Sequence, residues 1–442
     1  MATALPEERF KFTSGIKKQL SIIGLVGAVL FVLGLLYLII WGGSGHGHEA
    51  AGAAMEGAHG AAKAAHGAAE GGHSEFHWYE RLFTNLWINN VYFTGLAVIG
   101  LFFTAIQYVA QAGWSASIKR VPEAFGAWLP YAGVLMLVVF VAAWLSHSNL
   151  FHWTHSDLYE EGGAHYDPII AGKRPYLNIP FYLIRMVLYF VIWYMAYRYI
   201  RKESLAEDEF GGVSYYHKMV KYSTIFIILF AVTSSTSAWD WVLSIDTHWF
   251  STMFGWYVFA SWFVAGLAAI TLMVVRLREA GYLTIINSSH LHDLGKFVFA
   301  FSIFWTYVWF SQFLLIYYAN IPEESIYFVE RLSSDYYSPI FFINLFMNFF
   351  FPFLVFMTRD SKRHTIIIKV VCTVVLVGHW IDFYLMVTPA VLKENGTFGI
   401  LEIGLAMVYL AAFLFVVLGN LAKAPLVARN HPMLEESLHH HT

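Results

Sequence analysis

The sequence predicts an all-α polytopic membrane protein with ten transmembrane helices. Of the 442 residues, 58% are hydrophobic and only 13% are charged, whereas a soluble chain carries about a quarter charged residues. Ten apolar segments are long enough to cross ~30 Å of hydrocarbon. They cover approximately 20–41, 86–110, 124–146, 179–200, 222–245, 252–275, 297–320, 338–358, 365–389 and 398–420.

The N-terminal segment, 1–41, is expected to hold a retained first helix rather than a signal peptide. Lys17 and Lys18 precede an apolar run that is long enough to span and longer than a signal core. Cys372 is the only cysteine. A disulfide, a zinc site of cysteine type and a cysteine-ligated iron–sulfur cluster within the chain are therefore excluded. No basic block suggests nucleic acid as a partner.

The next segment, 42–85, is an Ala/Gly/His-rich loop of low complexity. His59, His66 and His73 recur every seven residues, so they would share one side of a helix. We interpret the loop as a solvated periplasmic spacer. Metal binding is the alternative, but the histidines form no closed ligand set. The helical domain covers 86–420 and a cytoplasmic tail covers 421–442, and we assign no function to its last residues, His439–Thr442.

The distribution of basic residues predicts that both termini are cytoplasmic. With the N-terminus inside, 20 of the 27 Lys and Arg residues fall in inner segments and 6 in outer ones. Cytoplasmic loops carry the excess of Lys and Arg. The remaining one, Arg185, lies inside the fourth helix. The protein is thus predicted to be a multi-pass protein of a bacterial cytoplasmic (inner) membrane.

Six helices place an ionisable or strongly polar residue in the outer half of the membrane, while the inner half is nearly free of them. At 1.5 Å per residue, the depths below the outer end are ~7 Å for Asp240, ~9 Å for Arg185, ~11 Å for Gln312, ~9–10 Å for Asp382, ~14 Å for His379 and ~6 Å for Glu402. Three further residues lie at the outer boundary: His147, Asp246 and His248. We expect these side chains to meet in one polar layer.

An ionised group in hydrocarbon costs at least ~2.5–3.5 kcal/mol, so such groups face the bundle interior and pair. We expect Arg185 to pair with a carboxylate. His379 and Asp382 are three residues apart and share a helix face. A carboxylate beside an imidazole raises the pKa of the histidine toward neutrality.

Each of these residues also has a structural interpretation. Arg185 could bridge helices, and Asp240 and Asp382 could be hydrogen-bonding glue between helices. Gln312 is more typical of packing than of ligand binding. The remaining two lie near the surface: Glu402 is expected to be partly hydrated, and His147 to be interfacial. The depth shared by the whole set favours function.

A buried carboxylate and a histidine among aromatic residues suit a quinol, whose two hydroxyl groups lose two protons as two electrons leave. We expect the site to consist of Asp240, His379 and Asp382 as proton-transferring groups. The supporting residues are His147, Arg185, Asp246, His248 and Gln312. Paired axial histidines at matched depth are missing, so we expect any haem or iron–sulfur cluster to belong to partner subunits.

Two other interpretations remain open. The hydroxyl groups of Thr233–Ser237 could form a proton half-channel leading to Asp240, or could simply allow close helix packing. A solute transporter is the other alternative, but such proteins favour broken helices and internal repeats, and neither is evident here.

Four stretches carry a resemblance to a known family. They are AWDWVLSIDTHWFSTMFGWY (238–257), DPIIAGKRPYLNIPFY (167–182), WFSQFLLIYYANIPEE (309–324) and GHWIDFYLMVTP (378–389). From about Trp87 onward the chain resembles the NrfD-like, polysulfide-reductase membrane-subunit family. Within it, the chain is similar to the second quinone-binding-type integral subunits of bacterial alternative complex III, the quinol:cytochrome c oxidoreductase.

The resemblance implies two four-helix bundles plus flanking helices. It also implies a complex with a sister ten-helix subunit, an iron–sulfur protein, a multihaem and a monohaem cytochrome, and an association with a terminal oxidase. The quinol would be menaquinol or ubiquinol. Because the sister subunit is expected to oxidise quinol, three roles stay open for this chain: a quinol site, proton transfer, or bracing of the assembly. The implied site residues are Asp240, Asp246, His248, Gln312, His379 and Asp382.

Overall fold

The computed structural model describes residues 7–41 and 77–441, and within these ranges the fold is entirely helical. It contains ten helices that are long and apolar enough to cross a membrane, which confirms the predicted all-α polytopic fold class. The predicted histidine repeat of His59, His66 and His73 lies outside the described residues.

The spanning helices keep the predicted order. Their bounds are α1 Ser14–Trp41, α3 Trp78–Val109, α4 Arg120–Phe125 with α5 Leu129–Leu145, α7 Ile179–Phe210, α8 Val213–Trp241, α9 Phe254–Glu279, α10 Ser288–Ala319, α12 Tyr337–Leu345 with α13 Phe351–Val355, α14 Thr365–Leu392 and α15 Ile400–Leu421. A π-helical turn, Phe346–Phe350, joins α12 to α13. Three short helices complete the described chain: α6 Pro168–Lys173, α11 Pro322–Ser333 and α16 Leu434–Leu438.

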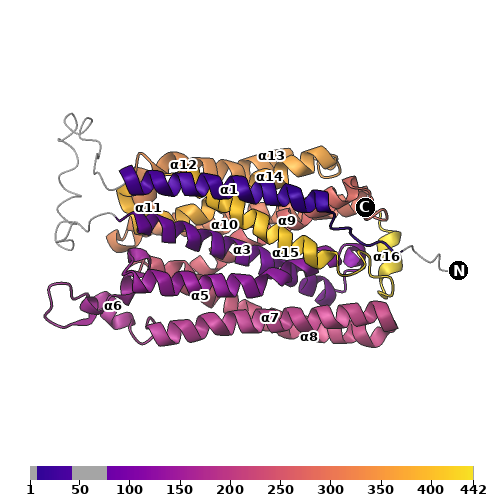
Figure 1. Cartoon of the computed structure of the whole chain (residues 1–442), viewed down its shortest axis with the longest axis horizontal. Helices are drawn as coiled ribbons and strands as arrows, with labels where there is room; N and C mark the ends of the chain where they lie inside the picture. Colours follow the sequence, from indigo (N-terminus) through magenta and orange to yellow (C-terminus); the bar gives the residue numbers. More distant parts are fainter. Residues whose placement is uncertain (1–6, 42–76, 442) are drawn as a thin grey trace.

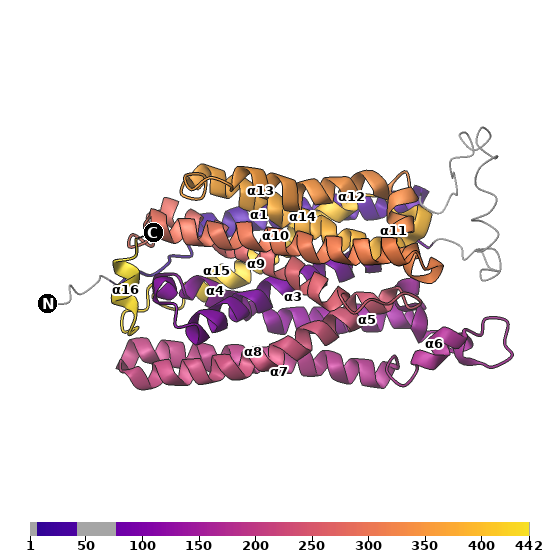
Figure 2. The same ribbon diagram turned by 180° about the vertical axis from the view of Figure 1, so that it is seen from behind.

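The helices form two four-helix bundles and a flanking pair. In the first bundle α3, α5, α7 and α8 contact one another in a ring, and in the second α9, α10, α12–α13 and α14 do so. The bundles meet where α3 and α8 pack on α9, and α1 packs along α15 at the side. Figures 1 and 2 show α7 and α8 at one edge of the molecule and α12 and α13 at the opposite edge.

Both ends of the described chain lie at one end of the bundles, here called the terminal end. The backbone N–H of Leu426 donates to the carbonyl of Glu8 at 2.8 Å, so the segments before α1 and after α15 are joined there. Helices α6 and α11 lie at the opposite, distal end (Figure 1). An even number of spans requires this shared side, as the sequence predicted.

Several helices are longer than the sequence predicted. Helix α3 begins at Trp78 rather than near residue 86, so the end of the predicted 42–85 loop is helical. Helices α7 and α8 continue to a tight turn at Gly211 and Gly212, where φ is 67° and 92°. Glycine adopts these left-handed values without steric cost. The turn therefore lies beyond the apolar span, where the two helices still pack on each other.

The terminal end holds a buried ionic network that the sequence did not predict. The ion pairs are Lys119–Glu207 at 2.5 Å, Arg120–Glu123 at 2.9 Å, Arg201–Glu123 at 2.8 Å and Arg120–Asp208. Three cations face three carboxylates, so the formal charges cancel. The sequence analysis had counted the basic members as loop residues. Extension of α7 past the apolar span buries them.

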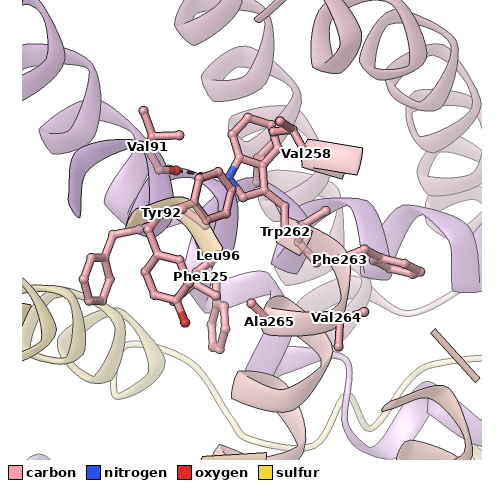
Figure 3. Packing of buried hydrophobic residues seen from close by; sticks show 14 of the residues in the cluster. Val91, Tyr92, Leu96, Phe125, Val258, Trp262, Phe263, Val264 and Ala265 are labelled. Atoms are coloured by element: carbon pink, nitrogen blue, oxygen red, sulfur yellow. Dashed lines mark hydrogen bonds between the residues drawn. The ribbon is translucent and has the colours of Figure 1, made fainter. Parts of the chain in front are cut away.

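The contact between the bundles is aromatic and close. Trp262 of α9 lies against α3, and its indole Nε1 donates to the carbonyl of Val91 at 3.2 Å (Figure 3). A Cβ on Gly95 would lie 1.9 Å from Cδ1 of Trp262, so only glycine fits there. The Trp262 ring also contacts those of Trp241 and Phe383, with centroids at 6.3 and 6.2 Å. These three rings, the aromatic seam, pack between α8 and α14.

Candidate functional site

Two buried polar centres lie toward the distal end, one in each bundle. The first centre joins α7 to α8. Arg185 donates from Nε and Nη2 to the two carboxylate oxygens of Asp240, at 2.7 and 2.8 Å. The hydroxyl of Tyr189 donates to the same carboxylate at 2.9 Å. The predicted pairing of Arg185 with a carboxylate is therefore confirmed.

The rest of the Arg185 guanidinium is also occupied. Its Nη1 donates to the carbonyl of Tyr176 at 3.0 Å, and its Cζ lies 4.0 and 4.2 Å from the ring centroids of Tyr176 and Phe181. Such a fork-to-fork pair is strong and geometrically specific. The first centre is thus a closed ion pair with its charge neutralised.

The second centre is built around Asp382 of α14, which is fully buried. Four neutral groups donate to its carboxylate. They are the hydroxyls of Tyr257 and Ser261 at 2.5 Å each, Nε1 of Trp305 at 3.0 Å and Nδ2 of Asn344 at 2.9 Å. The donors come from α9, α10 and α12, so one side chain ties the whole second bundle together. No Lys or Arg among the described residues forms an ion pair with Asp382.

His379 lies one turn from Asp382 on the same face of α14, as predicted. Its Nδ1 is 3.9 Å from a carboxylate oxygen, which is beyond ordinary hydrogen-bond distance. Both ring nitrogens are buried without a hydrogen-bond partner, and the ring meets Trp305 edge-on at 5.5 Å. A neutral imidazole with a free nitrogen beside a carboxylate can take up and pass on a proton.

A narrow pocket adjoins the second centre. Two of the residues that bond Asp382, Tyr257 and Asn344, also line this pocket, together with Trp309, Gln312, Tyr327, Phe328, Arg331, Phe341 and Leu385. Its free volume is about 10 Å³, which is room for about one water molecule. We call it the Gln312 pocket.

Gln312 is the polar residue of this pocket with an unmet hydrogen-bonding demand. The residue is 3% exposed, and among the described residues neither its amide oxygen nor its amide nitrogen has a partner. Buried polar groups are nearly always hydrogen-bonded. The amide of Gln312 thus forms no hydrogen bond to another helix of the described chain and lies free at the pocket.

Arg331 is the residue of this site that the sequence analysis missed. It was counted with the outer loops, yet it is 2% exposed and lines the Gln312 pocket. The charge pattern around it, PEESIYFVERLS, is that of a surface helix, so composition alone gave no reason to bury it. The sequence feature that could have indicated its burial is Pro389 in the facing helix α14, because a proline leaves one helical carbonyl without its donor.

Of the three residues predicted at the outer boundary, His147 and His248 join neither centre, whereas Asp246 lies within range of the charge of Arg331. His147 is exposed in a left-handed turn, with φ of 49°. His248 is half-exposed, and its Nε2 lies 2.5 Å from a carboxylate oxygen of Asp167. Burial raises the pKa of Asp246, and the charge of Arg331 opposes that rise. The expected single polar layer is thus wrong: His147, in the turn after α5, and His248, in the loop after α8, are both exposed.

Glu402 also differs from expectation, because it is fully buried rather than partly hydrated. Arg81 donates to both carboxylate oxygens at 2.7 and 2.6 Å, and Asn85 adds a bond at 2.9 Å. The backbone N–H of Gly399 donates to the same carboxylate at 2.7 Å. This group closes the start of α15 and fixes it to α3. It is a third polar contact, with a structural role.

The hydroxyls below Asp240 bond mostly within their own helix. Thr233 and Thr236 donate to the carbonyls of Leu229 and Val232, four residues earlier, at 2.8 and 3.0 Å. Thr236 is also a hydrogen-bond neighbour of Tyr189, whose hydroxyl donates to Asp240 at 2.9 Å. The proton half-channel and the packing role of Thr233–Ser237 therefore both stay predictions.

A comparison with known protein families and with curated proteins finds no match for this chain. Its function must therefore be argued from the two centres. In the parts that the structure describes, no group of three or more His, Cys, Asp or Glu residues is arranged to hold a metal ion. The side-chain groups available for chemistry at the two centres are carboxylate, imidazole, phenol and amide groups.

Proposed function

We propose that this chain is an integral membrane subunit of a respiratory quinol:electron-acceptor oxidoreductase, of the alternative complex III type. Its second centre binds quinol, accepts the protons that quinol releases, or does both. The partners would be the sister ten-helix subunit, the iron–sulfur protein and the cytochromes, in a bacterial inner membrane. The positive-inside distribution would place the distal end, with both centres, near the periplasm.

One observation carries the proposal: Asp382 is a buried carboxylate held by neutral donors beside a pocket with an unsatisfied amide. Asp240 is already matched by the charge of Arg185, whereas no Lys or Arg of the described residues pairs with Asp382, so in this proposal Asp382 is the carboxylate that receives a proton from the guest. The oxidation of a quinol breaks two O–H bonds. Two electrons pass to a partner, and two protons need acceptors, for which Asp382 and His379 are placed one behind the other.

The narrowness of the Gln312 pocket favours a second candidate, proton transfer without a quinol. A head group is far larger than about 10 Å³, so quinol binding requires the surrounding side chains or α11 to move. A water molecule fits without any such movement. In this alternative the chain passes protons that are released in another subunit.

The test is Asp382→Asn in the assembled complex, with quinol oxidation and proton release measured together. If quinol binds at the second centre, both rates fall by about 10²-fold or more, in the range lost when a general base is removed. If the chain only transfers protons, electron flow continues and the number of protons released per electron falls.

Thr271→Val is the matched control, because Thr271 is buried in α9 and donates only to the carbonyl of Leu267 at 2.7 Å. It should leave both rates unchanged. Normal rates in Asp382→Asn, with the complex intact, would contradict both candidates and leave only the bracing role.

A further inference from the structure

Arg331 occupies an unusual position at the end of α11. In the described chain no ion pair joins it to a carboxylate, although it is almost completely buried. Its three hydrogen bonds all go to backbone carbonyls: from Nε to Leu385 at 2.9 Å, from Nη2 to Met386 at 3.2 Å and from Nη1 to Tyr327 at 2.6 Å. Two of these acceptors belong to α14, the helix that carries Asp382.

The acceptor at Leu385 exists because of Pro389. In an α-helix the N–H of residue i donates to the carbonyl of residue i−4. Proline has no N–H, so Pro389 inside α14 leaves the carbonyl of Leu385 without its helical donor. Arg331 supplies the missing donor from another helix. An unpaired carbonyl in a membrane interior is strongly destabilising, so this bond is a strong local constraint.

Arg331 is one of three α11 residues that line the Gln312 pocket, with Tyr327 and Phe328. Its Cζ lies 3.4 Å from the ring centroid of Tyr327. The other face of that ring stacks on Trp249, at 4.1 Å and 14°. Helix α11 is therefore held over the pocket by the stack of Tyr327 on Trp249 and by the two bonds from Arg331 to α14, while the contact of Arg331 with Tyr327 lies within α11 itself.

The guanidinium keeps capacity for a guest. It has five N–H donors, and three are used by the carbonyls above. Two N–H groups remain on a side chain that lines the same pocket as the unpartnered amide of Gln312. Together these donors suit an oxygen acceptor, such as the carbonyl or phenolic oxygen of a quinone ring.

We infer that Arg331 is a positioning residue of the second centre: it latches α11 over the Gln312 pocket through the carbonyl that Pro389 leaves open, and its remaining N–H groups face the ring oxygen of the guest. The inference rests on the proposed quinol function. Opening of the latch gives a head group the space that the closed pocket lacks. Arg331 and Pro389 thus act together.

The experiment measures amide hydrogen exchange in α11 and binding of decylubiquinone, with the full chain in lipid nanodiscs. In Arg331→Ala, exchange across 322–333 rises by about tenfold or more, and decylubiquinone binds at least about tenfold more weakly, the loss of one good polar contact. Arg331→Lys recovers little, because an ammonium lacks the planar fork. Unchanged α11 exchange in Arg331→Ala would overturn the latch.

The double variant Arg331→Ala/Pro389→Ala separates positioning from mere bracing. Alanine at 389 restores the helical donor to Leu385, so α14 regains its stability without Arg331. If Arg331 positions the pocket, decylubiquinone still binds weakly to the double variant. If the double variant binds decylubiquinone with wild-type affinity, the inference is wrong, because the only role of Arg331 would then be to brace α14.

Arg174→Ala is the matched control, since Arg174 is an exposed arginine that follows α6 at the same, distal end of the bundles, and it should change neither measurement. If the wild-type chain binds no decylubiquinone, the quinol part of the proposed function fails. The exchange of α11 in Arg331→Ala then decides the latch by itself.

Discussion

The two buried aspartates of this protein occupy similar depths and opposite electrostatic situations. Asp240 in the first bundle receives both arms of Arg185, so its charge is neutralised within the pair. Asp382 in the second bundle receives four neutral donors and no cation. The first arrangement fixes two helices together. The second holds a carboxylate in place with neutral groups from three other helices, beside the Gln312 pocket.

The surroundings differ in the same direction. Next to Asp382, His379 and Gln312 each have two polar atoms without partners. Asn344 also accepts a 2.6 Å bond from Asn348, whose own oxygen is unpartnered. The first centre also has unpartnered atoms, on Tyr182 and Trp241, but these are single donors on aromatic rings. At the second centre the unpartnered atoms belong to amide and imidazole groups, which both donate and accept. Other such atoms lie elsewhere in the described chain, on Asn90 and His292 for example.

The largest effect that this comparison predicts is on stability, at the first centre. Arg185→Met should destabilise the protein by about 3–5 kcal/mol, because it leaves Asp240 buried and charged without its partner. The measurement is the unfolding midpoint in detergent, followed by size-exclusion chromatography. Asp382→Asn, which removes no cation, should lose clearly less.

A paired replacement sharpens the same point. Arg185→Leu/Asp240→Leu removes both charges, and replacing a buried ion pair by apolar residues is often neutral. The double variant should therefore recover most of the stability that Arg185→Met loses, and quinol-linked activity should persist in the complex. Loss of activity in a stable double variant would show that the first centre, and not only the second, takes part in the chemistry.

The next effect concerns the aromatic seam that separates the centres. Gly95→Ala inserts a methyl group against Trp262, and overpacking of this kind costs about 1–3 kcal/mol. Displacement of Trp262 also pushes on Trp241 and Phe383, each next in sequence to one of the two aspartates. Thermal unfolding and tryptophan fluorescence should both change. Gly172→Ala is the control, because a Cβ there has no neighbour within 4 Å. An unaltered Gly95→Ala protein would mean that the seam is loosely packed.

The sequence predicted the fold well because lipid imposes a single strong rule. Runs of apolar residues long enough to span must be helices, and all ten were found. The helix ends were predicted less well. Lys119 and Glu207 lie in segments that were predicted as loops. They neutralise each other in a buried pair, with Glu207 inside the extended α7 and Lys119 directly before α4. A charged residue is predicted to be exposed when no partner for it is known. A partner that lies far away in the sequence cannot be recognised from a short window of residues.

The candidate site was predicted in part, for a related reason. Spacing along one helix could place His379 beside Asp382. Spacing could not tell that Asp240 would find Arg185 while Asp382 would find only neutral donors, because those donors come from three other helices. Arg331 was missed for the same cause: its position follows from a proline 58 residues later in the chain. Pairing across helices is decided by packing, which the sequence states only indirectly.

The smallest predicted effect is the most diagnostic, because the substitution is expected to raise the stability of the protein rather than lower it. Gln312→Leu replaces a buried amide that has no partner by an apolar side chain of similar size. Leaving a buried polar group unsatisfied costs about 1–3 kcal/mol. If the pocket held nothing in the working protein, Gln312 would be a pure defect. We expect Gln312→Leu to raise the stability by about 1 kcal/mol, seen as a higher unfolding midpoint.

The same variant should lose function, because the amide meets its guest only when the pocket is occupied. Decylubiquinone binding and proton release in the complex should both fall, while Ser311→Ala, the neighbouring change on the same helix, should affect neither. A residue that costs stability and is needed for binding is a residue held for function. If Gln312→Leu is instead less stable and fully active, the amide is bonded in the working protein by a group of the protein itself. The contrast between a closed first centre and an open second centre would then be lost.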